Sequence, residues 1–555
     1  MNKIKVSDYI VEQLQKIGIK DFFGLPGDYN FKLLDSVENN ENTNWIGCTN
    51  ELNAGYAADG YARIKGYGAL ITTYGVGELS AINAIAGSCA ENVPVFKIVG
   101  VPNTKAVENN ILLHHNLNTP DYYAFQRAYA NVVETTAFLD KTNAKDEIDR
   151  LISVFIKEKR PVYLAVPADI CDLEIKDEPN IETPQSNSEN LKKAVEHAIK
   201  LINSSDFPCF LVDVLAKRFD ALESTKKLLT HTQLPVTTLL MGKSLIQEDS
   251  NMFLGTYLGS YDNLYAYKYI NNSDCVISIG TIFSDLNTFG FDIRFAPSKY
   301  INIQGTYTVV ENKKYENVLM KDVLDELTKT MKTYDVKIPK EELGYEKPQT
   351  ENNGQLKSDY IYPRLQEFLR PDDIIFSETG IVKFGVAGMK LPVDTSLNNQ
   401  VLWGSIGWAT PAAFGAAMAD KSRRVILLTG EGSHQLTAQE ISSMMRYGVK
   451  PIVIVLNNSG YTIERILSDD PMDKFNDIAV WDYSKLPSVF KGNVWTAQAE
   501  TNEEFNNVLN QAEIEQQNRM CYIEIFTEML DVPLLTKRVV KKLRDKEPKM
   551  EFQVK

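Results

Sequence analysis

Hydrophobic and polar positions follow two kinds of pattern along the chain. Short apolar runs rich in β-branched residues recur at Ala69–Thr73, Val93–Val99, Val162–Val166, Cys209–Val212, Cys275–Ile279, Val425–Thr429 and Ile452–Leu456. Amphipathic stretches long enough to form helices lie between them. Strands separated by helices predict parallel sheets with helices on both faces, because a parallel pair needs a long crossover connection. The pattern therefore predicts an α/β protein.

Two polar stretches interrupt this alternation. Lys176–Asn190 and Pro339–Lys357 are rich in proline, asparagine and acidic residues and lack periodic apolar positions, which is typical of linkers. They predict three domains, over residues 1–180, 190–340 and 355–555, each of an ordinary domain size. Ala69–Pro102 and Arg424–Asn458 share the order strand, glycine-rich turn, helix, strand, which is a weak sign of an internal duplication.

Composition narrows the class of protein. The 555 residues carry 59 Lys+Arg and 73 Asp+Glu, so the net charge of 59 − 73 = −14 argues against nucleic acid as a partner. The basic stretch Lys537–Arg544 is interpreted as a solvated helix face. No apolar run reaches the ~20 residues that span a bilayer, and Asp8 and Glu12 interrupt any signal-peptide core. Six scattered cysteines without a C-x-x-C pair fit a reducing cytoplasm. We expect a cytoplasmic enzyme.

The most informative segment is a turn that follows a buried strand, Gly430-Glu431-Gly432-Ser433. Its glycines let backbone N–H groups approach a phosphate, and ligands bind at the carboxyl ends of parallel strands. A helix with apolar residues from Leu436 onward is predicted to follow the turn. The next strand ends in Asn457-Asn458 and then Gly460. A carboxylate, an amide oxygen and a backbone carbonyl suit Mg²⁺. Glu431, Asn458 and Gly460 are therefore the predicted metal ligands.

Gly-acid-Gly followed by 24 residues and Asn-Asn resembles the metal-diphosphate motif of thiamine-diphosphate (ThDP) enzymes. Further segments resemble the non-oxidative 2-oxo acid decarboxylases, a group that contains pyruvate, indolepyruvate and branched-chain 2-oxo acid decarboxylases. These segments follow one another along nearly the whole chain: Gly27–Asn30, Asn50–Arg63, Thr72–Ser88, His114-His115, Ser377–Gly380, Leu402–Trp408 and Gly460–Arg465.

The resemblance implies a fold and a set of roles. The fold would be three doubly wound parallel-sheet domains: a pyrimidine-binding domain, a middle domain without cofactor and a diphosphate-binding domain. Glu51 matches the residue whose carboxyl bonds the cofactor's aminopyrimidine ring, and Ile406 matches the side chain that bends the cofactor. The matching proton-transfer set is Asp28, His114, His115 and Glu464, whose mixed acids and imidazoles suit proton exchange near neutral pH. The matching cofactor contacts are Thr73, Val76, Thr379, Gly404, Ile406, Gly432 and Ser433.

The resemblance also implies partners. The cofactors would be ThDP and Mg²⁺, and the ligand a small-molecule 2-oxo acid, with no nucleic acid and no membrane involved. In this family Glu51, Asp28 and the histidines come from one subunit and the metal turn from another. A homodimer with shared active sites, paired into a homotetramer, is therefore expected.

Three positions depart from the family pattern. Glu431 stands where relatives usually have aspartate, one methylene shorter, and we expect the site still to bind metal. Gly380-Ile381-Val382-Lys383 lacks two hydroxyls found in relatives, and Lys383 falls on a pocket-lining position. Because a buried ammonium is costly, Lys383 is expected to turn outward or pair with an acid. Recognition of an acidic substrate tail is the alternative. Val212–Leu215 lacks the cysteine linked to substrate activation in some yeast relatives.

Family positions around the substrate are Leu286, Lys383, Phe384, Ile463 and Leu467. This mainly aliphatic set favours a broad decarboxylase of aliphatic or aromatic 2-oxo acids over a strict pyruvate decarboxylase. Two other readings stay open. A ThDP carboligase of the acetolactate-synthase type would normally lack the histidine pair and carry a flavin. A catalytically silent binding homologue is suggested only by Glu431 and the changes at Gly380–Lys383.

Overall fold

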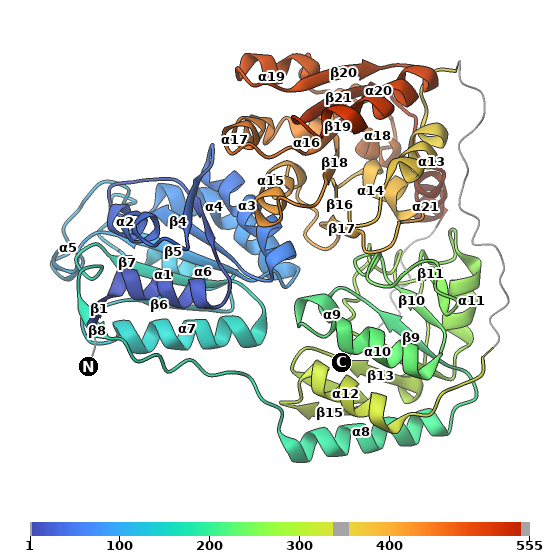
Figure 1. Ribbon diagram of the computed structural model, residues 1–555, viewed down its shortest axis with the longest axis horizontal. Helices are drawn as coiled ribbons and strands as arrows, with labels where there is room; N and C mark the ends of the chain where they lie inside the picture. The colour runs from blue at the N-terminus through green and yellow to red at the C-terminus, as the bar shows by residue number, and fades with distance from the viewer. Residues whose placement is uncertain (1–2, 337–353, 546–555) are drawn as a thin grey trace. The chain divides into compact units, whose positions relative to one another are not determined.

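The computed structural model describes residues 3–336 and 354–545. The main elements are three large sheets with helices packed on them (Figure 1). Packing divides the chain into two compact units. The first unit comprises Met1–Pro184, Gly407–Ser422 and Thr437–Pro451, and the second comprises Gln185–Ile406, Arg423–Leu436 and Ile452–Lys555. Two segments from late in the sequence therefore belong to the unit that begins at the N-terminus.

The first unit is built on a six-stranded parallel sheet. Its strands, in spatial order, are β3 (Asn44–Gly47), β2 (Asp21–Gly24), β4 (Gly68–Thr73), β5 (Val95–Val101), β7 (Val162–Pro167) and β6 (Thr135–Phe138). One face packs into a core with α1, α2 and α7, in which Phe22, Ile71 and Ile98 are fully buried. The helices of this unit include α1 (Val6–Lys16), α2 (Phe31–Asn39), α3 (Glu51–Lys65), α4 (Val76–Ala90), α5 (Thr104–Glu108), α6 (Ala124–Tyr129), α7 (Ala144–Glu158), α15 (Ala409–Ala419) and α17 (Ile441–Arg446).

Helices α3 and α15 touch backbone to backbone. A Cβ on Gly415 would lie 1.8 Å from the carbonyl oxygen of Ala57, and one on Gly60 would lie 1.9 Å from that of Ala412. Alanine-rich flanks allow this approach, since small side chains let two helix axes come close. A buried hydrogen bond also connects the two helices, since the Trp408 indole N–H donates to Asp59 at 2.9 Å.

The first sheet of the second unit has seven strands. In spatial order they are β11 (Phe253–Thr256), β10 (Val236–Thr238), β9 (Pro208–Val212), β12 (Cys275–Ile279), β13 (Tyr300–Ile303), β14 (Tyr307–Val310) and β15 (Lys313–Glu316). β14 and β15 run antiparallel to their neighbours, because the connections that precede them are too short for a parallel crossover. The surrounding helices include α8 (Ser188–Asn203), α10 (Leu222–Thr232), α11 (Leu264–Asn272) and α12 (Met320–Thr330).

The second sheet of the second unit is parallel throughout. Its strands, in spatial order, are β17 (Ser396–Asn399), β16 (Ile374–Ser377), β18 (Val425–Gly430), β19 (Ile452–Asn457), β21 (Cys521–Phe526) and β20 (Trp495–Ala499). The helices that accompany it include α13 (Ser358–Phe368), α14 (Ile381–Ala387), α16 (Glu431–His434), α18 (Thr462–Leu467), α20 (Asn502–Glu515) and α21 (Leu534–Asp545).

These sheets confirm the predicted α/β class and all seven predicted strands to within two residues at each end. The middle sheet is mixed rather than purely parallel, because of the β13–β15 meander. Part of the predicted linker Pro339–Lys357 lies outside the described residues, and the exact domain boundaries stay a prediction. Lys537, Arg538 and Lys541 are exposed on α21, as expected for a solvated helix face. Among the helices that the structure describes, none is long and apolar enough to cross a membrane.

Candidate functional site

Glu51 is the first residue of α3, just after β3. The side chain of Asn50 fixes this helix start by accepting from the backbone N–H of Asn53 at 2.8 Å. The Glu51 side chain is half-buried. Its Oε1 lies 3.1 Å from the point that a Cβ on Gly77 would occupy, so the first turn of α4 runs directly past the carboxyl. A glycine at position 77 keeps that space open.

The turn between β4 and α4 is shaped by Gly75, whose φ is 67°. A Cβ at this position would lie 2.3 Å from the carbonyl oxygen of His115, so glycine is required both by the backbone and by the neighbouring loop. The two predicted cofactor contacts flank the turn. Thr73 is buried and its hydroxyl has no hydrogen-bond partner, whereas the Val76 side chain is 54% exposed.

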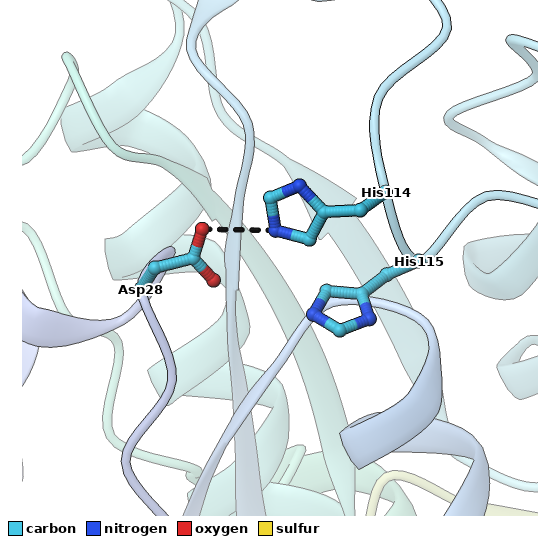
Figure 2. A group of neighbouring side chains, drawn as sticks. All are labelled: Asp28, His114 and His115. Carbon is cyan, nitrogen blue, oxygen red and sulfur yellow. Dashed lines mark hydrogen bonds and ion pairs between the residues drawn. The ribbon is translucent and has the colours of Figure 1, made fainter.

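Asp28, His114 and His115 lie together, as Figure 2 shows. His114 Nε2 is 2.9 Å from Asp28 Oδ2, and its Nδ1 is 3.2 Å from the Tyr29 hydroxyl. A carboxylate can only accept, so a neutral His114 donates from Nε2 and accepts the Tyr29 proton at Nδ1. The His115 ring stands edge-on to His114, with the centroids 4.5 Å apart. Its backbone has a φ of 68°, an uncommon conformation for a residue other than glycine.

The predicted metal ligands also lie together, at the carboxyl ends of β18 and β19. Glu431 Oε1 accepts from the backbone N–H of Gly460 at 2.8 Å and from that of Asn458 at 3.2 Å. The Glu431 side chain is buried, and burial raises its pKa to about 7 against the opposing effect of these N–H groups. Among the described residues, no lysine, arginine or histidine forms an ion pair with it. A buried carboxylate without a cationic side chain fits a divalent metal ion.

Gln400, just after β17, links two predicted cofactor segments. Its side-chain oxygen accepts from the Ser405 backbone N–H at 2.7 Å, and its backbone oxygen accepts from the Thr379 hydroxyl at 3.4 Å. The Gln400 side-chain nitrogen and the Ser377 hydroxyl are buried without a hydrogen-bond partner. Gly404 has a φ of 65°, and a Cβ there would meet nothing within 4 Å. Unpartnered polar atoms beside open space fit a polar ligand such as ThDP.

The helix predicted from Leu436 onward is wrong in its start. α16 ends at His434, a 3₁₀ turn follows at Ala438–Glu440, and α17 begins only at Ile441. Leu436 lies in the break and is 44% exposed. The physical reason lies in Thr437, whose φ of −141° is not helical and whose hydroxyl donates to the Gly407 carbonyl at 2.7 Å. The predicted cofactor residues Gly432 and Ser433 lie on α16 and are buried.

Three predicted pocket residues, Leu286, Phe384 and Ile463, belong to one hydrophobic cluster of the second unit. Leu467 is 44% exposed. Of the two arrangements expected for Lys383, turning outward or pairing with an acid, the first is wrong, because its side chain is buried. Its Nζ lies 5.6 Å from the centroid of the Phe384 ring, where a cation–π contact offsets part of the desolvation. Glu464 is exposed on α18 in the second unit, whereas Asp28, His114 and His115 are in the first.

The sequence pattern alone did not single out three features. Leu535 and Val539 of α21 join the cluster around Phe384. Gln400 connects Thr379 with Ser405. Lys97 is fully buried in β5, and its signal in the sequence was one charged residue inside an otherwise apolar strand. Ile406, the predicted cofactor-bending residue, is half-buried.

Three sequence families match the chain in order. They are described as the thiamine pyrophosphate enzyme N-terminal TPP binding domain (residues 4–125), central domain (195–328) and C-terminal TPP binding domain (383–525). Curated relatives include pyruvate decarboxylase isozyme 2 of Saccharomyces cerevisiae and the pyruvate decarboxylase of Kluyveromyces lactis, each 38% identical over 549 residues. The pyruvate decarboxylase of Candida glabrata is 37% identical over 555 residues. Each alignment covers 96% of this chain and 97% of the relative.

The chain belongs to the thiamine-diphosphate-dependent 2-oxo acid decarboxylase family. The resemblance inferred from the motifs is thereby confirmed, and so are the enzyme class and ThDP as the cofactor. The first unit holds the predicted site residues Glu51, Asp28 and the histidine pair. The second holds the Glu431 turn, Thr379, Gly404, Ile406 and Glu464. The individual roles of these residues stay predictions.

Proposed function

We propose that the protein converts the anion of a 2-oxo acid and one proton into an aldehyde and CO₂, with ThDP and Mg²⁺ as cofactors. The observation that carries this proposal is the cluster of Asp28, His114 and His115, in which His114 is hydrogen-bonded to Asp28. A carboligase of the same superfamily shares the metal turn but would normally lack this histidine pair. The relatives named above are pyruvate decarboxylases, which supports the same reaction class.

ThDP, when bound, supplies the electron sink for the carbanion that CO₂ loss leaves. Glu431, Asn458 and Gly460 would hold Mg²⁺, and Gly432 and Ser433 would contact the diphosphate. The carboxyl of Glu51 would bond the aminopyrimidine ring. His114 is oriented at both ring nitrogens, by Asp28 and by Tyr29. Such an oriented imidazole can hold or deliver the proton that completes the aldehyde, with His115 beside it.

The direct test supplies ThDP, Mg²⁺ and a panel of 2-oxo acids and measures CO₂ and aldehyde. Pyruvate, branched aliphatic and aromatic substrates belong in the panel. We expect turnover of several of them, because the cluster around Phe384 is apolar. Release of CO₂ without aldehyde, together with bound flavin absorbance, would favour the carboligase reading. Silence on every substrate would refute the proposed reaction.

The chemistry of the predicted pocket residues supports breadth rather than one short substrate. Leu286, Phe384 and Ile463 belong to one hydrophobic cluster, and a methylene more or less changes binding by only ~1–3 kcal/mol. Lys383→Ala distinguishes between two roles for this lysine, recognition of an acidic substrate tail and packing. A changed ranking between acidic-tailed and apolar substrates would support recognition of an acidic tail. An unchanged ranking would leave Lys383 as a packing residue.

Changes at Glu431 are expected to act through the metal. Glu431→Gln removes the buried charge and should weaken Mg²⁺-dependent ThDP binding by more than the ~10–100-fold typical for loss of an outer-shell partner. Glu431→Asp should retain binding with altered affinity, because the carboxylate remains. Titration of Mg²⁺ into apoprotein plus ThDP, followed by protein fluorescence, measures both. Equal Mg²⁺ affinities for wild type and Glu431→Gln would contradict the assignment of Glu431 as a ligand.

We also propose a homodimer with shared sites, paired into a tetramer. Large apolar side chains are exposed on both units, including Ile111 and Leu117 on the first and Phe475 and Val480 on the second. Such exposed apolar groups support association. Co-expression of Glu51→Gln with Glu431→Gln tests the sharing. Random pairing of two inactive chains should restore about a quarter of wild-type activity, because a hybrid dimer carries one intact site of two. No recovery in a confirmed hybrid dimer would argue for sites within one chain.

A further inference from the structure

Asp28, His114 and His115 also have the composition of a transition-metal site. Two imidazoles and one carboxylate are a ligand set that open zinc sites use, with water completing the coordination. One ligand atom from each of the three side chains lies within 4.8 Å of the other two, as Figure 2 shows for the group as a whole. All three residues belong to the first unit, so the geometry of the group is set within one compact body.

The separations are close to those that a single metal ion requires. Zinc bonds of about 2.0–2.1 Å place neighbouring ligand atoms of a tetrahedral site roughly 3.3–3.5 Å apart. His114 Nε2 and Asp28 Oδ2 are 2.9 Å apart, so they need to separate only slightly. The His115 ring is half-buried and its centroid lies 4.5 Å from that of His114. A modest rotation of the His115 side chain therefore completes the set of three.

Tyr29 and Gly75 hold the two imidazoles in place. The Tyr29 ring stacks on His114, with the centroids 4.8 Å and the planes 15° apart, and it meets the His115 ring edge-on at 6.1 Å. The His115 carbonyl oxygen packs against Gly75, where a Cβ would lie 2.3 Å from it. Because the ligands are held near one another before an ion arrives, little ordering has to be repeated on binding.

Tyr29 also offers the outer-shell partner that a metal-bound histidine needs. An ion at His114 Nε2 displaces the proton that this nitrogen now donates to Asp28. The displaced proton is replaced at Nδ1, so the ring stays neutral. Nδ1–H then donates to the Tyr29 hydroxyl oxygen, which already lies 3.2 Å away. A bond of this kind fixes the tautomer and the orientation of a ligating imidazole.

The donor atoms discriminate between this group and the predicted magnesium site. Mg²⁺ prefers an octahedron of oxygen ligands, such as those of the Glu431 turn, whereas imidazole nitrogen suits Zn²⁺ and similar transition ions. The side chains of His114 and Asp28 are 57% and 49% exposed, so an ion reaches them from solution. Zinc can therefore bind here while Mg²⁺ is present in excess.

We propose that Asp28, His114 and His115 form an inhibitory site for Zn²⁺ or a similar divalent transition-metal ion. The ion takes the nitrogen lone pairs at which the imidazoles would accept a proton, and its charge opposes protonation beside it. Bound metal thereby removes the cluster from proton transfer. The inhibitory part of this inference rests on the proposed function, whereas binding of the ion does not.

Zinc titration of the full chain at neutral pH, with ThDP and Mg²⁺ in excess, tests the site. Competition with a coloured zinc chelator measures the bound zinc, and CO₂ release at each zinc concentration measures inhibition. We expect one zinc ion per chain at this site. Activity should fall as the site fills and return when EDTA equimolar with the zinc is added.

Variants of the ligands and of the outer-shell partner separate their contributions. His114→Gln and His115→Gln should each weaken zinc binding by about 100-fold or more, because losing a ligand costs more than the ~10–100-fold typical of an outer-shell partner. Tyr29→Phe keeps the stacked ring but removes the hydroxyl, and should weaken zinc binding by about 10-fold. If either glutamine variant fails to fold, Asp28→Asn removes the carboxylate ligand at an exposed position and carries the same expectation.

His197→Gln is the matched control. His197 contacts an acid and a tyrosine much as His114 does, with Glu311 Oε2 at 2.9 Å and the Tyr315 hydroxyl at 3.1 Å. Among residues 3–336 and 354–545 it belongs to no group of three potential ligands. His197→Gln should bind zinc as the wild type does and keep wild-type activity.

Zinc affinity that is unchanged in both His114→Gln and His115→Gln would overturn the inference. Wild-type zinc binding that disappears in excess Mg²⁺ would overturn it as well. Zinc bound through these residues without any loss of turnover would refute the inhibition. A wild type that decarboxylates no 2-oxo acid, but binds zinc in a manner that His114→Gln abolishes, would instead refute the proposed function and leave the metal site standing.

Discussion

Glu51→Gln should lower the rate of aldehyde formation by about 10²–10⁴-fold, the range that a positioned acid–base group contributes. The amide has nearly the same shape but cannot exchange a proton with the aminopyrimidine ring. Because Asn50 makes the cap of α3 and Glu51 itself is half-buried, the thermal midpoint should stay close to that of wild type. Initial rates of aldehyde formation with saturating ThDP and Mg²⁺, and a melting curve, measure the two effects.

Glu503→Gln is a matched control, since Glu503 is an exposed acid in the first turn of α20. Its activity should equal that of wild type. If the rate of Glu51→Gln stayed within about twofold of the wild-type rate, the loss would be far smaller than the factor that general acid–base catalysis contributes. Glu51 would then have no proton-transfer role. A fall in rate accompanied by an equal fall in stability would assign Glu51 to the fold instead.

Gly415→Ala should produce the largest loss of stability. Its new Cβ would lie 1.8 Å from the Ala57 carbonyl oxygen, and neither α15 nor α3 can yield without moving backbone. Overpacking in a core costs typically 1–3 kcal/mol, and a backbone clash should reach the upper end or exceed it. An apparent melting temperature lower by roughly 6 °C or more is expected for a unit of this size.

Gly388→Ala is the companion variant for this experiment. Gly388 closes α14 with a φ of −81°, and a Cβ there would meet only the Gly385 carbonyl oxygen at 3.7 Å. It should melt within about 1 °C of wild type, as expected for a substitution that creates no clash. If Gly415→Ala and Gly388→Ala had the same melting temperature, the close contact between α3 and α15 would not be a determinant of stability.

The sequence predicted the parts of this fold that depend on local pattern. Buried strands followed by glycine turns place Glu431, Asn458 and Gly460 at one sheet edge, and the structure brings these three into hydrogen-bond contact. His114 and His115 are neighbours in the sequence, and the family motif paired them with Asp28. These features follow from strand direction and from motif spacing, which a single sequence carries.

The features that the sequence missed depend on partners far away in the chain. Lys383 was expected to turn outward or to pair with an acid because a charge is costly to bury. It does not turn outward, because every residue of its helix is buried. The helix break at Leu436 depends on a bond from Thr437 to Gly407, 30 residues away. The contact of Leu535 and Val539 with the cluster around Phe384 joins residues about 150 positions apart. Periodicity reports which face of a helix is buried but not which partner covers it.

The close pairing of α3 with α15 also constrains how the protein is made. The bond from Trp408 to Asp59 joins residues 349 positions apart, and α17 arrives later still. At a synthesis rate of about 5–20 residues per second, α3 waits roughly 20–70 s on the ribosome before its partner helix emerges. During that time its alanine- and glycine-rich face has no cover from this chain. Synthesis of the first unit therefore starts at the N-terminus but is complete only after α17 has been made. Its folding in the cell should depend on chaperones that shield α3.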